Sequence, residues 1–328
     1  MLNKLKPIAN IVQGRPLMAV FEINLVCNSK CTYCDLPLNQ GRYELSREQI
    51  KTIFSHLYNE GLRYVFLQGG EPTLRKDLPD VMSDLKQIGL DVTLITNGTR
   101  IKPVLIESLK AVKASISISL DSLDREHYKR IRGADQLGLV LNGIERLRDY
   151  PYPKYTTCIV SELNKDDVID VVRFSRERGF IPVVGAYHWD IERYGKVDKE
   201  LQYQKQIAAS VFEEVIKSDL VPPGYFNQYL KDNVEWLNDR PLKSCDAGRY
   251  SIAIDASGNV APCLALKHAG NLLEYSLNEI LANFYQQAIK SCSDKSSCNM
   301  MCSRVVGSNL RNPIMAMKTP QTIPATLD

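Results

Sequence analysis

The chain has 328 residues, nine cysteines, 24% charged residues and a formal net charge of +3. This length suits one large domain with a small appendage, and so weak a net charge gives no electrostatic reason to expect binding to nucleic acid or to a membrane surface. No apolar run is long enough for a transmembrane helix, and residues 1–16 lack the apolar segment of a secretory signal. The clustered cysteines fit a reducing cytoplasm better than a secreted disulfide scaffold, so we expect a cytoplasmic protein.

The predicted elements alternate between strands and helices over most of the chain. Buried strands are expected at 17–26, 64–68, 92–96, 114–120, 155–160 and 181–185, and helices at 47–59, 78–88, 103–112, 137–149, 166–178 and 199–218. Ser46 is the expected N-cap of the first of these helices, with Gln49 three residues on. The alternation favours a parallel sheet with helices outside, and right-handed crossovers curl such a sheet into a full or partial barrel.

The alternation ends after residue 220, where the composition changes. A strand–turn–strand is expected at 251–262 with its turn at 257–259, followed by a helix at 277–289. The fold class is therefore α/β, a partial (β/α)6 TIM-like barrel with a small C-terminal extension of a β-hairpin and a helix. The expected segments are a lead-in at 1–16, the barrel at 17–220, a linker with a short helix at 221–242, the extension at 243–305, and a tail at 306–328 that forms a surface strap or is loosely ordered.

Cys27, Cys31 and Cys34 follow the first predicted strand with the spacing C-x3-C-x2-C. Spacings this short strain a disulfide, and three thiols so close together cannot all face a hydrophobic core. They can, however, converge on one soft metal centre. Four thiolates complete a structural zinc site or an ordinary iron–sulfur cluster, whereas three leave one metal corner open for another ligand.

This motif, with Tyr33 before its last cysteine and a strand before its first, resembles that of the radical S-adenosylmethionine (SAM) superfamily. The resemblance implies a [4Fe-4S] cluster coordinated by the three cysteines and by the amino and carboxylate groups of SAM. It also implies an electron donor such as flavodoxin or ferredoxin, cleavage of SAM to methionine and a 5′-deoxyadenosyl radical, and abstraction of hydrogen from a substrate. Half of a zinc ribbon and three unrelated cysteines are the alternative interpretations.

Gly69-Gly70-Glu71-Pro72 ends the second predicted strand. Two glycines let the backbone pass close to a ligand, and Glu71 offers a hydrogen-bond acceptor. In the superfamily this motif binds the amino group of SAM, and the resemblance implies the same role here. A strand-to-loop turn with a solvated Glu71 is the structural alternative.

Polar residues near the ends of the next two predicted strands are further candidates for SAM binding. Ser117, Ser119 and Asp121 alternate along the chain, so they share one face of a strand. A polar face directed into a barrel indicates a polar ligand, and the resemblance implies contact with the ribose and methionine parts of SAM. The remaining candidates are Asn97, which otherwise forms a turn, Arg132, which pairs with the SAM carboxylate or belongs to a solvated basic loop, and Tyr33, which would pack near adenine.

The C-terminal extension carries five cysteines, and their spacing resembles that of the SPASM/Twitch domains of radical SAM enzymes. The expected hairpin brings Cys245 and Cys263 together, and the others follow the predicted helix. Five cysteines are too few for two complete clusters. The resemblance therefore implies one auxiliary [4Fe-4S] cluster held by Cys245, Cys263, Cys302 and either Cys298 or Cys292. A zinc site is the alternative that these spacings also permit.

Two cysteines remain without a metal, namely Cys158 and whichever of Cys292 and Cys298 is spare. A spare thiol near the substrate donates a hydrogen atom to a substrate radical in peptide epimerases of the superfamily, so Cys292 and Cys158 are candidate catalytic residues. A small buried side chain is the alternative for either. The triplet 188–190 (His-Trp-Asp) follows the sixth predicted strand and is expected to touch substrate or to form a capping loop.

The substrate is expected by analogy alone. SPASM and Twitch enzymes mostly modify ribosomally made peptides, which favours a peptide that is epimerised, crosslinked or oxidised. The chain shows no additional N-terminal domain for peptide recognition, which argues against that assignment. The first alternative is a small molecule, such as a carbohydrate or alcohol that is dehydrogenated, or a lipid or nucleoside that is rearranged or adenosylated. The second is a zinc-binding protein without catalytic activity.

Overall fold

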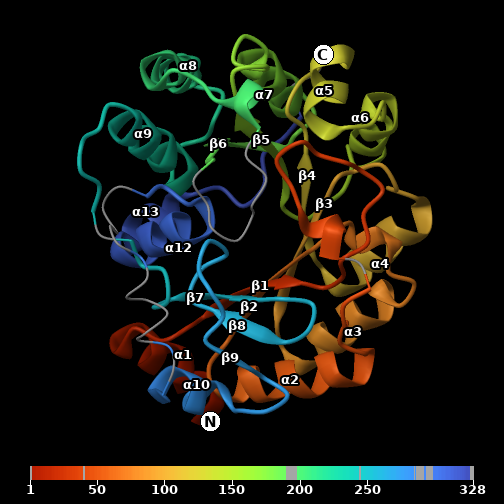
Figure 1. Ribbon diagram of the computed structural model, residues 1–328, viewed down its shortest axis with the longest axis vertical. Helices are drawn as coiled ribbons and strands as arrows, with labels where there is room; N and C mark the ends of the chain where they lie inside the picture. The colour runs from red at the N-terminus through yellow and green to blue at the C-terminus, as the bar shows by residue number, and fades with distance from the viewer. Residues whose placement is uncertain are drawn as a thin grey trace.

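The computed structural model describes residues 2–39, 41–189, 198–243, 245–283, 285, 292 and 298–325, apart from the side chains of residues 2–5, 302, 303, 313 and 318. The first six strands run parallel and lie in sequential order in the sheet, which confirms the expected partial barrel (Figure 1). These strands are β1 (Met18–Glu22), β2 (Tyr64–Gln68), β3 (Asp91–Thr96), β4 (Ser115–Ser119), β5 (Lys154–Val160) and β6 (Ile181–Ala186).

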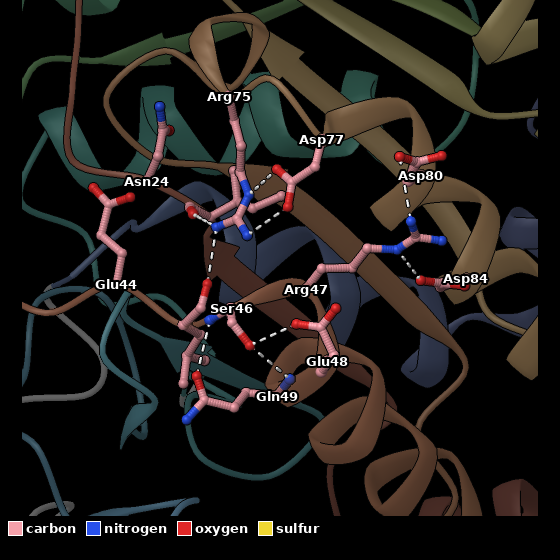
Figure 2. Close-up of polar contacts among 12 residues, drawn as sticks. Asn24, Glu44, Ser46, Arg47, Glu48, Gln49, Arg75, Asp77, Asp80 and Asp84 are labelled. Atoms are coloured by element: carbon pink, nitrogen blue, oxygen red, sulfur yellow. Dashed lines mark hydrogen bonds and ion pairs between the residues drawn. The ribbon is translucent and has the colours of Figure 1, made fainter.

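The helices between the strands surround the barrel, as expected for right-handed crossovers. They are α2 (Arg47–Asn59), α3 (Leu78–Ile88), α4 (Pro103–Val112), α6 (Leu137–Arg146), α7 (Val168–Glu177) and α8 (Lys205–Lys217). The predicted capping box of α2 is present: Gln49 N–H donates to Ser46 Oγ at 3.3 Å, and Ser46 N–H donates to Gln49 Oε1 at 2.9 Å (Figure 2).

The two faces of the strands have different partners. On one face, alternate residues such as Phe21 and Leu67 are fully buried in the main hydrophobic cluster beneath the helices. Phe21 packs against Phe54 of α2 with ring centroids 5.2 Å apart. The opposite face lines the barrel interior, where Met18 and Val20 form a separate small cluster with residues of the C-terminal extension. The period-two alternation therefore separates structural side chains from those that can meet a ligand.

The C-terminal extension continues the barrel sheet. The expected hairpin is confirmed as β7 (Ser251–Ile254) paired antiparallel with β8 (Asn259–Ala261), and β9 (Gly270–Asn271) pairs with β8. Strand β7 also pairs in parallel with β1, with Met18 opposite Ser251 and Phe21 opposite Ile254. The sheet order is accordingly β6-β5-β4-β3-β2-β1-β7-β8-β9.

Several helices differ from the sequence-based expectations. Helix α1 (Leu2–Gln13) occupies the expected lead-in, and α9 (Tyr225–Leu237) fills much of the expected linker. Helix α10 (Leu277–Asn283) begins where predicted, while most of its predicted C-terminal part lies outside the described residues. None of the helices in the described part of the chain is long and apolar enough to cross a membrane.

The tail was expected to be a strap or loosely ordered, and this expectation is wrong for its first part. Helices α12 (Met301–Arg311) and α13 (Pro313–Lys318) continue the chain there. Helix α12 contacts α9 and β7, and α9 contacts β6, so the two helices lie across the open side of the barrel between β6 and β7 (Figure 1). Val306 of α12 packs against the small cluster inside the barrel, so apolar burial holds this helix in place.

Helix α5 (Arg125–Arg132) was not predicted, because it is short and mostly charged, with only Tyr128 and Ile131 as apolar residues. It begins at Asp124, whose Oδ1 accepts from His127 N–H at 2.8 Å, and it ends at Gly133, which adopts a left-handed conformation with φ of 66°. His127 Nδ1 also lies 2.8 Å from Asp167 Oδ2, next to the start of α7. This hydrogen bond raises the pKa of His127, and the charges of Asp167, Asp124 and Asp166 act in the same direction.

The His127–Asp167 pair predicts a pH-dependent contribution to stability. Because the folded-state pKa of His127 is raised, its stabilisation is complete below the unfolded pKa near 6.5 and is lost as the pH rises through the folded pKa. We expect wild-type protein to exceed His127→Gln in unfolding free energy by less than about 1 kcal/mol near pH 6, since the histidine is half exposed. Thermal unfolding of both proteins across this range checks the prediction. A difference that grows with pH would contradict it.

Candidate functional site

The three N-terminal cysteines lie in the loop between Ile23 and Leu45, here called the cysteine loop, which follows the carboxyl end of β1. Burial, with the nearby Cys31 and Cys27 acting in the same direction, raises the pKa of Cys34 to about 12. Burial likewise raises the pKa of Cys27, with Cys31 acting in the same direction. Neighbouring thiols with raised pKa values suit a cationic partner that would hold them as thiolates.

Donor groups already point at these sulfur atoms. Ser29 N–H donates to Cys27 Sγ at 3.4 Å, and Arg132 Nη1 lies 4.0 Å from Cys31 Sγ. Among the described residues, no three His, Cys, Asp or Glu side chains converge closely enough to hold a single metal ion. The donor set nevertheless fits an iron–sulfur cluster, which is wider than one ion and is ligated by thiolates with N–H groups directed at sulfur.

Hydrogen bonds from neighbouring elements fix the cysteine loop. Asn97, at the end of β3, donates from Nδ2 to Asn28 Oδ1 at 2.8 Å and to Ser29 Oγ at 3.1 Å. Gln136, the residue before α6, donates to the carbonyl of Asn28 at 3.0 Å and accepts from Ser29 Oγ at 3.0 Å. Asn97 was expected to contact SAM, and here it contacts the loop. Asn28, Ser29 and Gln136 were not singled out in the sequence, because no local pattern reveals such tertiary contacts.

Glu71 is 1% exposed, so the alternative of a solvated side chain is wrong. Its Oε1 accepts from Thr73 N–H at 3.0 Å, Thr73 Oγ at 2.6 Å and Thr96 Oγ at 2.7 Å, and its Oε2 accepts from Asn97 N–H at 2.7 Å. The carboxylate thereby joins the ends of β2 and β3. Its expected contact with the SAM amino group stays a prediction.

Gly69 and Gly70 allow close approach of the protein's own backbone. A Cβ at Gly69 would lie 2.4 Å from the carbonyl oxygen of Asn24, and one at Gly70 would lie 2.2 Å from that of Val26. Gly70 N–H donates to Asn24 O at 2.8 Å, and Glu71 N–H donates to Val26 O at 2.8 Å. The glycines were expected to admit a ligand, and in the structure they admit the first residues of the cysteine loop.

Asp121 and Arg132 form a buried ion pair. Asp121 is fully buried, and its Oδ2 lies 2.7 Å from Arg132 Nε while its Oδ1 accepts from Ile159 N–H at 2.9 Å. Arg132 also ends α5 and lies beside Cys31. The expected contacts of both residues with SAM therefore compete with a strong contact that they make with each other.

The inward face of the barrel strands carries further polar residues beside the two predicted serines, together with apolar ones such as Met18, Val20 and Phe66. Ser117 Oγ and Thr157 Oγ lie 2.9 Å apart across β4 and β5, and Ser119 lies one step further along the same face. The register of the six strands adds further inward residues of the same kind, although the sequence analysis missed them: Glu22, Gln68, Thr93, Ser115 and Tyr155. The same alternation that singled out Ser117 would have identified them. None of the inward positions of β1–β6 carries lysine or arginine.

Cys158 faces the helices and not the barrel interior. It is 2% exposed, belongs to the main hydrophobic cluster, and its thiol donates to the carbonyl oxygen of Asp121 at 3.6 Å. Its neighbour on the same face, Thr156, donates to Ser175 of α7 at 2.8 Å. Burial raises the pKa of Cys158 well above its usual value. This position removes the geometric basis for a hydrogen-donating role, and the alternative of a small buried side chain describes it.

Aromatic residues border the cysteine loop. The ring of Tyr33 lies 6.0 Å from that of Tyr187, which follows β6, and the Arg132 guanidinium lies 5.9 Å from the Tyr33 ring centre. The row continues through Trp189, whose centroid is 5.9 Å from Tyr187. His188 stacks on Trp236 of α9 at 4.6 Å, and the third member of the predicted triplet, residue 190, lies outside the described residues. Packing of Tyr33 near adenine stays a prediction.

The C-terminal cysteines gather near the start of α12. Cys245 and Cys263 are buried in one cluster, and Cys292 packs against it. Burial raises the pKa of Cys298, and the nearby Cys245 and Cys292 act in the same direction. Arg304 donates to the carbonyl oxygen of Cys298 and to that of Lys243, so it joins both cysteine-bearing segments. The side chain of Cys302 lies outside the described residues.

Comparison with known families agrees with these two cysteine sites. A model of the radical SAM superfamily matches residues 21–175, and a model of an iron–sulfur cluster-binding domain, SPASM, matches residues 245–304. A probable GTP 3′,8-cyclase of Saccharolobus islandicus is 34% identical over 294 residues, which is 84% of this chain and 91% of the relative. One from Pyrococcus abyssi is 34% identical over 49% of this chain, and the match spans only 54% of that protein.

Solved structures share the fold at low sequence identity. Streptococcus suis SuiB bound to the precursor peptide SuiA gives a TM-score of 0.68 at 18% identity, covering 85% of this chain and 68% of SuiB. The anSMEcpe structure with bound AdoMet gives 0.66 at 18% identity, covering 86% of this chain and 88% of that one.

The chain belongs to the radical SAM superfamily and carries a C-terminal SPASM domain. It is therefore an enzyme that uses a [4Fe-4S] cluster and SAM, and its C-terminal domain binds auxiliary iron–sulfur. The alternative of a zinc-binding protein without catalytic activity is excluded.

Two glycine substitutions test the packing of the cysteine loop. Gly70→Ala places a Cβ 2.2 Å from a main-chain oxygen that cannot move independently, so we expect a loss of about 1–3 kcal/mol or more and reduced iron binding. Gly138→Ala in α6 meets nothing within 4 Å and should change stability by less than about 0.5 kcal/mol. Thermal unfolding and iron content after anaerobic reconstitution measure both effects. Equal behaviour of the two variants would contradict the described packing.

Proposed function

We propose that this radical SAM enzyme modifies a ribosomally synthesised peptide by epimerisation, crosslinking or oxidation. The observation that carries the proposal is the inward face of the barrel, which combines hydroxyl, amide and carboxylate groups with apolar side chains and has no lysine or arginine on its six strands. A peptide is rich in uncharged donors and acceptors that such groups satisfy. A nucleoside triphosphate would require several cations to balance its phosphates. The SuiB structure, whose bound ligand is a precursor peptide, lends support through its fold.

We assign the site residues as follows. Cys27, Cys31 and Cys34 hold the cluster that SAM completes, and Cys245, Cys263, Cys302 and either Cys298 or Cys292 hold the auxiliary cluster. When bound, the cluster and SAM supply the 5′-deoxyadenosyl radical that takes hydrogen from the substrate. The SAM pocket is assigned to Tyr33, Gly69, Gly70, Glu71, Pro72, Asn97, Ser117, Ser119, Asp121 and Arg132.

The chain's own groups hold this site together. Glu71 fixes the ends of β2 and β3, and Asn97 carries that constraint to the cysteine loop. The Asp121–Arg132 pair keeps a positive charge beside Cys31, where thiolates would otherwise lie unbalanced. We further infer an electron carrier such as flavodoxin or ferredoxin as partner, and a cytoplasmic location.

A second candidate is cyclisation of GTP. It is favoured by the Saccharolobus relative, a probable GTP 3′,8-cyclase that aligns over 91% of its length. Rearrangement of a nucleoside belongs to the small-molecule alternatives already considered. The two candidates differ in the charge of the substrate, so a direct comparison of substrates separates them.

The substrate comparison uses the reconstituted full-length enzyme. We expect about eight irons per chain, for one SAM-binding and one auxiliary cluster, and formation of 5′-deoxyadenosine on reduction with SAM. Synthetic peptides encoded by short reading frames beside the gene should accelerate this formation and change in mass, whereas GTP should leave the rate unchanged. Cys31→Ala is the control without SAM cleavage. Consumption of GTP coupled to 5′-deoxyadenosine would support the second candidate and contradict the first.

Cys292 is either a ligand of the auxiliary cluster or a hydrogen donor, and its position beside Cys245 and Cys263 favours the ligand. We expect Cys292→Ala to lower the iron content of the reconstituted protein while the SAM-dependent change in the electron paramagnetic resonance (EPR) spectrum persists. Cys158→Ala is the control: this cysteine is buried in the main hydrophobic cluster and is not assigned to either iron–sulfur cluster, so the variant should retain full iron content. Intact iron content with altered stereochemistry of the product would assign Cys292 as the donor, and intact iron content with normal turnover would remove both roles.

A further inference from the structure

The cysteine loop leaves and rejoins the barrel at a narrow neck. Ile23 directly follows β1, and Leu45 directly precedes Ser46, the N-cap of α2. Both residues are buried in the main hydrophobic cluster. All three N-terminal cysteines lie between these two points, so the separation of the two ends limits where the thiols can go.

A single guanidinium group bridges this neck. Arg75 follows the turn η2 (Pro72–Leu74) beyond β2, and its Nη1 donates to the carbonyl oxygen of Ile23 at 2.9 Å and to that of Leu45 at 3.1 Å. The side chain of Arg75 is only 11% exposed, and Figure 2 shows it pointing toward Ser46 and Asp77. One side chain from the β2 end thus holds the first and last residues beside the loop at a fixed separation.

Asp77 holds Arg75 in this orientation. Arg75 Nε donates to Asp77 Oδ1 at 2.7 Å, and Nη2 donates to Oδ2 at 3.1 Å, which is the two-pronged geometry that only arginine provides (Figure 2). Burial alone would raise the pKa of Asp77, but the hydrogen bonds and charge of Arg75 hold it below its usual value. The carboxylate is therefore ionised at neutral pH, and the ion pair leaves Nη1 free to face the neck.

Several other contacts each hold one side of the neck. Asn24 and Val26 bond to the main chain of Gly70 and Glu71 on the leading side, and Leu45 N–H donates to the carbonyl oxygen of Ala256 at 2.8 Å on the trailing side. Glu44 Oε1 accepts from Leu25 N–H at 2.8 Å, which joins the two sides of the neck to each other but not to the end of β2. Arg75 differs from these groups because it joins both sides to the barrel with one rigid side chain.

We propose that Arg75 is a positioning residue for the SAM-binding cluster: by closing the neck it preorganises Cys27, Cys31 and Cys34 to converge on one group. The proposal rests on the assignment of these three cysteines as ligands in the proposed function. Holding both ends of a loop reduces the conformational entropy that is lost when its ligands are gathered. Substitution of a residue that orients metal ligands through hydrogen bonds typically lowers metal affinity by about 10–100-fold.

The test measures cluster retention in full-length protein reconstituted anaerobically. Iron release to a chelator gives the rate of cluster loss, and the EPR change on adding SAM identifies the cluster with an open iron. In Arg75→Met we expect the SAM-responsive cluster to be lost about 10–100-fold faster than in wild type, with the auxiliary signal unchanged. Arg75→Lys and Asp77→Asn should fall between, because each retains part of the hydrogen bonding.

Arg47→Lys is the matched control. Arg47 lies in the same region and pairs with Asp80 at 3.2 Å and Asp84 at 2.6 Å, joining α2 to α3 and not to the neck (Figure 2). The Arg47→Lys variant should therefore lose its SAM-responsive cluster at the wild-type rate.

Three outcomes would overturn the proposal. In the first, Arg75→Met loses its SAM-responsive cluster at the wild-type rate. In the others, its auxiliary cluster is lost faster by the same factor, or Arg47→Lys loses its SAM-responsive cluster as fast as Arg75→Met does. If Arg75→Met does not fold, Arg75→Lys and Asp77→Asn decide by the same criteria. A wild-type protein without a SAM-responsive EPR signal would overturn the assignment of the cysteines themselves, and this failure is recognised before any variant is made.

Discussion

The buried carboxylate of Glu71 determines how the elements of the site are arranged. Taking a carboxylate out of water costs several kcal/mol unless its oxygens are fully hydrogen-bonded. Here Thr73, Thr96 and the main chain of Asn97 supply the donors, so the ends of β2 and β3 are fixed to each other. A glutamine would turn an N–H₂ group toward some of these donors, and an aspartate would be too short to reach both strand ends. The charge is therefore tolerated because it organises two loops at once.

Hydrogen bonds connect Glu71 to the cysteine loop through Asn97. The Asn97 side chain donates hydrogen bonds to Asn28 and Ser29. The glycines before Glu71 let the backbone of the cysteine loop pack directly against the end of β2. The same short segment of sequence after β2 thus serves packing and positioning together. This explains how a motif expected to bind a ligand can be filled by contacts within the protein while still defining the place where a ligand would sit.

Much of the barrel was predictable because local patterns determine it. Helices α2, α3 and α4 begin and end where their apolar periodicity and flanking residues indicate, and the buried strands follow from their composition. Helix α5 escaped prediction because its stability comes from Asp124, Gly133 and contacts with α7. The cysteines and Gly69–Gly70 were visible since their chemistry or conformation is unusual. Gln136 and Arg75 were not, because ordinary side chains acquire such roles only through tertiary contacts.

The pairing of β7 with β1 has a consequence for how the enzyme can be divided. Residues Met18–Glu22 are buried throughout, and both edges of β1 are hydrogen-bonded, to β2 on one side and β7 on the other. A barrel shortened to end before β7 would present an apolar strand with a row of unsatisfied N–H and C=O groups, which is a template for association with other copies. The cluster-binding extension therefore acts as the cover of an otherwise aggregation-prone sheet edge, and the two parts are expected to remain soluble only as one chain.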